Sequence, residues 1–116
     1  MTTAERKAES ISLTALAEEL LGQARAASSD RAAHTVSGVR GHRLRDTAIA
    51  LAAGEELAEH SSPGEATLQV LRGRVRLTTP TVSVELAAND FMVIPAERHA
   101  LAALEEAVVL LTVVTE

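Results

Sequence analysis

The chain has 116 residues, a formal net charge of −5 and 47% hydrophobic residues. A chain of this length forms one domain, because a typical domain takes about 100 to 150 residues. It contains no cysteine and one Phe as its only aromatic residue, which excludes disulfides, thiolate metal sites, cysteine nucleophiles and aromatic stacking platforms. The acidic balance argues against nucleic acid and anionic membranes as partners.

The first ten residues, MTTAERKAES, are polar where a secretory signal would be apolar. No stretch of the sequence approaches the roughly 20 apolar residues that span a bilayer. We therefore expect a cytoplasmic protein with no membrane partner.

An amphipathic helix is predicted before residue 30. Apolar residues recur at steps of three and four from Ile11 to Ala27, and Ser10 or Ser12 can cap the N-terminus. Polar residues up to Asp30 then compete for backbone hydrogen bonds and end the helix. The apolar stripe needs a surface, ordinarily the rest of the domain or a second subunit and less often a separate partner. Its members include Leu13, Leu16 and Leu20.

After residue 30 the hydrophobic period changes to two, in short runs separated by Gly, Pro, Asn or Asp. Such short runs leave no room for crossover helices, so they predict an all-β fold of antiparallel strands arranged as two sheets or a barrel. We expect residues 1–30 to form a tail and helix and residues 31–116 to form the β domain. The predicted strands span residues 32–37, 43–52, 56–60, 66–71, 74–78, 81–86, 90–94, 98–104 and 107–114.

Two features of this region carry further expectations. Gly73 lies between two runs and is predicted to take a positive φ in a tight hairpin. The last run, residues 107–114, is apolar on both faces apart from Thr112, so it must be buried on both sides or sealed by a partner. Together with the helix stripe, this strand predicts a closed homodimer, because symmetric pairing covers exposed edges without growing fibres.

Two segments carry candidate chemistry. In the first, Gly54 is followed after five residues by His60, then by Ser62, Ala66 and Gly73 at fixed spacing. It resembles the first motif of the cupin superfamily, in which a glycine precedes His-x-His, a glutamate and a second glycine. Gly54, His60 and Gly73 fall on that pattern.

The second segment, residues 89–99, resembles the second cupin motif, in which a proline precedes a histidine. Pro95 and His99 match it, with the histidine one residue early. The resemblance covers about residues 42–114. It implies an antiparallel double-sheet (jelly-roll) β-barrel of the cupin or RmlC-like type, behind the N-terminal amphipathic α-helix. It implies no single activity, because the superfamily includes enzymes, ligand binders, sensors and storage proteins.

The departures from the motifs concern the metal. Metal-dependent cupins hold an ion with two His and one Glu of the first motif and the His of the second. The resemblance places His60, Ser62, Ala66 and His99 at these positions, so two of the four ligands are missing. Catalytic metal sites keep at least three protein ligands. We therefore expect no tightly bound cofactor and, at His60 and His99, at most a weakly held divalent ion (Zn, Ni, Mn or Fe).

Alternation along the strand places Ala66, Leu68 and Val70 on the inner face if His60 points inward. The predicted ligand site therefore combines an apolar wall with a few polar groups, and consists of His60, Ser62, Ala66, Leu68 and His99. Such a pocket suits a small, largely apolar molecule better than a sugar, which needs several convergent hydrogen-bonding groups.

Three functions remain open on this evidence. The leading one is a non-catalytic or weakly metal-binding module for a small apolar ligand. The second is a metal-dependent enzyme of the dioxygenase or isomerase type that uses His60 and His99 with a third ligand from elsewhere. The third is a structural dimerisation domain. No catalytic residue stands out, and the sequence leaves open whether any catalysis occurs.

Arginines and two histidines cluster in residues 31–45. Such a group could bind an anion. An exposed, solvated face of the leading strands is the favoured interpretation.

Overall fold

The computed structural model describes residues 10–60 and 64–115, with the backbone only for residues 59 and 60. Within these residues, one helix precedes nine strands. These are α1 (Leu13–Ala26), β1 (Arg31–Ser37), β2 (Leu44–Leu51), β3 (Glu56–His60), β4 (Ala66–Arg72), β5 (Arg74–Thr78), β6 (Ser83–Ala87), β7 (Phe91–Val93), β8 (His99–Ala103) and β9 (Ala107–Val114).

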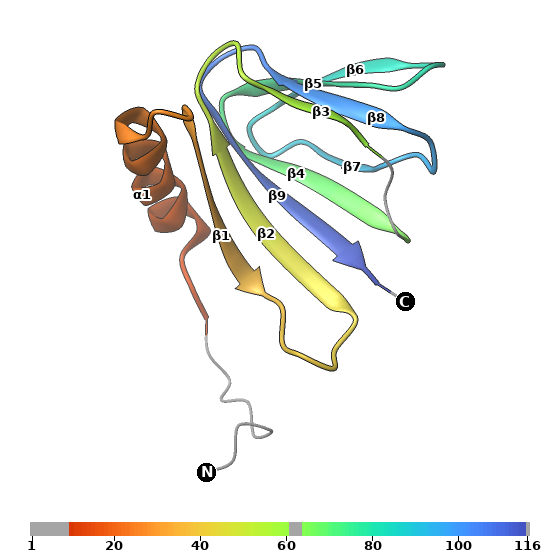
Figure 1. Ribbon diagram of the computed structural model, residues 1–116, viewed down its shortest axis with the longest axis horizontal. Coiled ribbons are helices and arrows are strands. Elements are labelled where there is room, and N and C mark those ends of the chain that lie inside the picture. Colours follow the sequence, from red (N-terminus) through yellow and green to blue (C-terminus); the bar gives the residue numbers. More distant parts are fainter. Residues whose placement is uncertain (1–9, 61–63, 116) are drawn as a thin grey trace.

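The strands form two sheets that face each other (Figure 1). The first has the order β1-β2-β9-β4-β7 and the second the order β3-β8-β5-β6, and every paired neighbour is antiparallel. The all-β, two-sheet prediction is confirmed. The predicted barrel is not closed, because no strand within residues 10–60 and 64–115 is hydrogen-bonded to both sheets.

Helix α1 begins where the sequence provides a cap. The Ser12 side chain accepts a hydrogen bond of 3.1 Å from the amide of Ala15, which satisfies one of the free donors of the first turn. The helix lies on the side of the first sheet that faces away from the second sheet (Figure 1). Its buried side chains pack against that outer face, where they meet Ala48, Ala50 and Val108. They are Ala17, Leu20, Leu21 and Ala24.

Two ion pairs connect α1 to the first sheet and to the loop before β9. Arg25 makes a two-point contact with Glu106, with nitrogen–oxygen distances of 2.7 and 2.5 Å. Arg72 pairs with Glu18. Both pairs are partly exposed, so they position the helix while the buried apolar stripe supplies most of the stabilisation.

The apolar strand β9 lies in the middle of the first sheet, between β2 and β4. The sequence left open whether this strand is buried on both sides or sealed by a partner. The structure shows that it is buried on both sides within one chain. Val108 lies in the cluster under α1, and Val109 lies in the core between the sheets. The homodimer stays a prediction, but β9 no longer supplies a reason for it.

Turn chemistry sets two strand boundaries. Gly73 joins β4 to β5 with φ +78°, and a Cβ there would lie 2.1 Å from the carbonyl oxygen of Glu106, so the predicted glycine turn is confirmed. The Thr79 hydroxyl accepts from the amides of Thr81 and Val82 at 3.2 and 3.0 Å. These bonds hold residues 79–82 in a turn, so β6 starts at Ser83, later than predicted.

Within the described residues, no helix has the length and apolar character needed to cross a bilayer.

Candidate functional site

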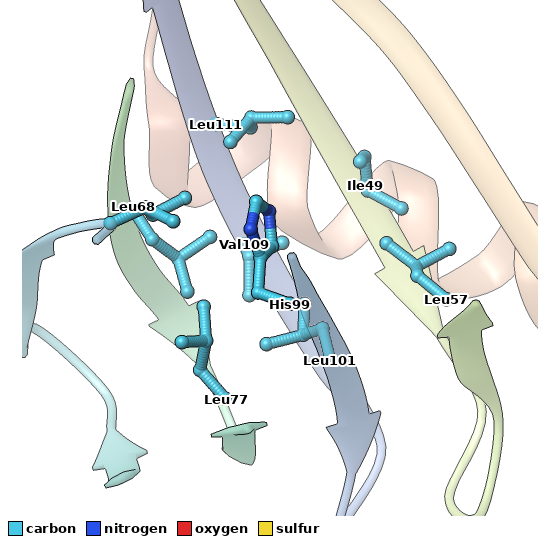
Figure 2. Close-up of a pocket in the computed structure, with 9 residues that line it drawn as sticks. Ile49, Leu57, Leu68, Leu77, His99, Leu101, Val109 and Leu111 are labelled. Carbon is cyan, nitrogen blue, oxygen red and sulfur yellow. The ribbon is translucent and has the colours of Figure 1, made fainter. Parts of the chain in front are cut away.

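A small cavity lies between the inner faces of the two sheets (Figure 2). Its volume is about 30 Å³. Strands of both sheets contribute to its wall, and the described residues of the wall are aliphatic except for one imidazole. The lining residues are Ile49, Leu57, Leu68, Leu77, Ile94, His99, Leu101, Val109 and Leu111.

His99 is the polar member of this wall and is only 3% exposed. In Figure 2 its ring lies among the leucine and valine side chains of the cavity. Its Nδ1 lies 3.0 Å from the carbonyl oxygen of Glu97. A carbonyl oxygen only accepts, so Nδ1 carries the proton of this hydrogen bond. The loop before β8 thus fixes the position of the imidazole.

The backbone register brings His60 opposite His99 in the ladder between β3 and β8. The ladder starts with Glu56 opposite Ala102 and continues with Leu57 opposite Leu101, and its register then shifts before His60. An unshifted ladder would place residue 59 opposite His99, so the irregularity is what pairs the two histidines. Directly opposed residues of antiparallel strands are neighbours with Cα atoms about 4.5 to 5.5 Å apart. Their joint use as metal ligands stays a prediction.

The other residues of the predicted ligand site do not all line the same space. Leu68 is 2% exposed and lines the cavity. Ala66 is 3% exposed and lines a neighbouring groove instead. Both belong with Val70 to the core between the sheets, as the strand alternation predicted. Ser62 lies outside the described residues.

The groove opens at the end of the molecule where β4 begins and β9 ends. Its volume is about 730 Å³. Ile94 lines both the groove and the cavity. The remaining wall of the groove is mixed in character and comprises Arg43, Gly64, Glu65, Ala66, Val93, Pro95, Ala96, Val114 and Thr115.

The residues that the structure describes do not fit a tight metal site. No group of three or more His, Asp or Glu side chains lies close enough together among them to hold an ion. A catalytic zinc or iron site needs three protein ligands with an open position. The two motif histidines supply at most two.

Much of the cavity wall was missed from the sequence. A usable signal existed, because Leu101 lies two residues after His99 and therefore faces the same side of β8. No pattern in the sequence tells which strands of the opposite sheet meet that side. The missed residues are Ile49, Leu57, Leu77, Ile94, Leu101, Val109 and Leu111.

Comparison with known proteins agrees with this architecture. No protein-family model and no curated protein matches the chain. Among solved structures, a conserved protein of unknown function from Streptococcus pyogenes is similar over 97% of this chain and 91% of its own, at 27% identity and a TM-score of 0.72. A cupin superfamily protein from Desulfitobacterium hafniense is similar over 96% and 94%, at 19% identity and a TM-score of 0.76.

The DMSP lyase DddQ from Ruegeria pomeroyi is also similar, over 74% of this chain and 47% of that one, at 18% identity and a TM-score of 0.64. Other matched structures are RmlC-like cupins. The chain is therefore a small cupin-fold domain, as its two motifs predicted.

Proposed function

We propose that the protein is a binding module that takes up a small, largely apolar molecule between its two sheets. The observation that carries the proposal is the chemistry of the cavity wall, which consists of eight aliphatic side chains and the buried imidazole of His99. An aliphatic wall excludes sugars and other polyols, because their hydroxyl groups would lose hydrogen bonds to water without replacement.

The size of the cavity restricts the ligand further. A volume of about 30 Å³ holds two waters at most. Pockets for drug-sized ligands begin at about 300 Å³. A ligand of more than a few heavy atoms must therefore displace flexible leucines or extend out of the cavity.

A metal-dependent enzyme is the second candidate. The register that sets His60 opposite His99 favours it, since two imidazoles on adjacent strands can share an ion. The fold similarity to a lyase is compatible with it. Both histidines would then need a third ligand from outside the two motifs.

One experiment separates the two candidates. Untagged protein from unsupplemented cells is analysed for metals and then heated with butanol, pentanol, hexanol and the matching ketones. An empty protein whose melting temperature rises with these compounds supports the binding module, because a ligand of the native state raises stability by mass action. Stoichiometric tightly bound metal with no shift contradicts it and favours the enzyme.

A further inference from the structure

We infer that the ligand of the proposed binding module is an aliphatic carboxylate, with its chain in the cavity and its carboxylate group in the groove at Arg43. The inference rests on the proposed function and adds the chemical class of the ligand. It follows from the lining residue that the cavity and the groove share, and from the charged side chains in and near the groove.

Cavity and groove share one lining residue. Ile94 lines both spaces and is 7% exposed. Its amide donates a 2.9 Å hydrogen bond to the carbonyl of Ala66, so the backbone at this point is fixed to β4. The shared Ile94 side chain is therefore the place where we infer that the small apolar cavity and the larger groove communicate. An elongated ligand that outgrows the cavity would extend into the groove.

One of the lining residues of the groove, Arg43, has an exposed side chain that carries a guanidinium group. No carboxylate of the described residues lies within ion-pair distance of this side chain. The position of Arg43 is set by its carbonyl, which accepts bonds of 2.8 and 3.2 Å from the amide and hydroxyl of Thr115. Glu65 lines the same groove without an ion pair to Arg43.

A second guanidinium strengthens the positive potential at this end of the sheet. Arg45 is paired with Val113, which packs on the intersheet core, so Arg45 starts from the inner face of β2. Among the described residues, its Nη1 donates to main-chain carbonyls, those of Val39, His42 and Leu44. Carbonyl oxygens orient the group, and Arg45 has no ion pair with a carboxylate of residues 10–58 or 64–115.

These charges select the head group. A carboxylate matches the planar donor fork of arginine and forms stronger, charge-assisted hydrogen bonds than a neutral hydroxyl does. Arg43 and the nearby Arg45 favour an anionic head group at their end of the groove, and Glu65 of the same wall carries the opposing charge. An aliphatic carboxylate therefore satisfies the cavity and the groove at once.

The test compares hexanoate with hexanol, which share a chain and differ in the head group. Titrations are run on the wild-type protein, on Arg43→Gln and on Arg40→Gln, a control that removes an exposed arginine of the same loop. We expect hexanoate to bind about tenfold more tightly than hexanol to wild type. Arg43→Gln should abolish this preference while keeping hexanol affinity, and Arg40→Gln should keep it.

Equal affinity for the two compounds, or a preference that survives Arg43→Gln, overturns the carboxylate assignment and leaves the binding module intact. Failure of both compounds to bind the wild-type protein contradicts the binding module itself. An Ile94→Ala variant provides a second readout. It should shift the optimum toward longer carboxylates, and an unchanged chain-length profile would show that the two spaces do not communicate at Ile94.

Discussion

Val108 and Val109 are adjacent in β9, yet their side chains are buried in two different apolar clusters on opposite faces of one sheet. Val108 packs under α1 and is 0% exposed. Val109 lines the cavity between the sheets and is 1% exposed. Equal burial and identical chemistry make these residues a matched pair for separating stability from binding.

Truncating either valine should destabilise the protein by about 2 kcal/mol, because each loses two buried methyl groups and leaves a void. Only Val109→Ala enlarges the cavity. Denaturant unfolding should therefore give similar losses for both variants, whereas added hexanol should restore more stability to Val109→Ala than to Val108→Ala. Equal recovery in the two variants would mean that hexanol binds elsewhere.

The contact between α1 and the loop before β9 predicts a dependence of stability on pH. Hydrogen bonding to Arg25 holds the pKa of Glu106 below its ordinary value of 4.5. A carboxyl group with a lowered folded-state pKa stabilises the fold above its unfolded pKa, and the effect disappears as the pH falls through the folded value.

We therefore expect Glu106→Gln to be less stable than wild type at neutral pH, with the difference shrinking below pH 4.5. Glu105→Gln is the control, since Glu105 has no ion pair among the described residues. Urea unfolding across this pH range measures the effect. A Glu106→Gln deficit that is constant with pH would show that the charge of Glu106 does not contribute.

The metal prediction concerns Ser62, at the position of a missing ligand. We expect wild-type protein to carry little metal in neutral buffer and Ser62→His to bind zinc or nickel more tightly, because three imidazoles hold a divalent ion far better than two. Calorimetry measures the affinity. The gain should disappear in the double variant that also carries His60→Gln. An unchanged affinity in Ser62→His would place residue 62 away from the two histidines.

The dimer prediction now concerns strand β7, at the edge of the first sheet. Phe91 and Val93 on this strand are 61% and 65% exposed, and apolar side chains on an edge strand are commonly covered by a partner. Sedimentation at about 100 μM, where micromolar dimers persist, should give about 24 kDa, twice the chain mass of 12.2 kDa.

Phe91→Glu should return the protein to monomer, whereas Val82→Glu in the turn between β5 and β6 should not. A wild-type monomer under these conditions would contradict the dimer.

The strands could be predicted well where the sequence marks both ends. The strand after Gly73 and the strand of residues 107–114 have the predicted bounds, because polar or glycine-containing turns flank them. The start of β6 was missed because Thr79 holds Thr81 and Val82 in the turn, and a side-chain hydrogen bond of this kind leaves no periodic signal.

The sequence predicted only some of the residues that line the cavity, because periodicity and motif spacing carry local information. Motif spacing identified His99, and alternation identified Leu68. The partners of His99 across the core, such as Val109 and Leu111, depend on how two sheets face each other. That arrangement is a tertiary property, and strand periodicity specifies only which side chains share a face. The role of α1 was open for the same reason, since its stripe fits either the chain's own sheet or a second subunit.

The central claim, that a small apolar molecule binds between the sheets beside His99, is tested most directly by methyl-resolved NMR during a titration with hexanol. The account predicts shifts in the methyl groups of Leu77, Leu101 and Val109, which line the cavity, and in the ring protons of His99. The methyl resonances of Leu20 and Leu21 in α1, and of Val108 beneath it, should not shift and serve as the internal control. Shifts confined to the methyl groups under α1, or none up to the solubility limit of hexanol, would contradict the account.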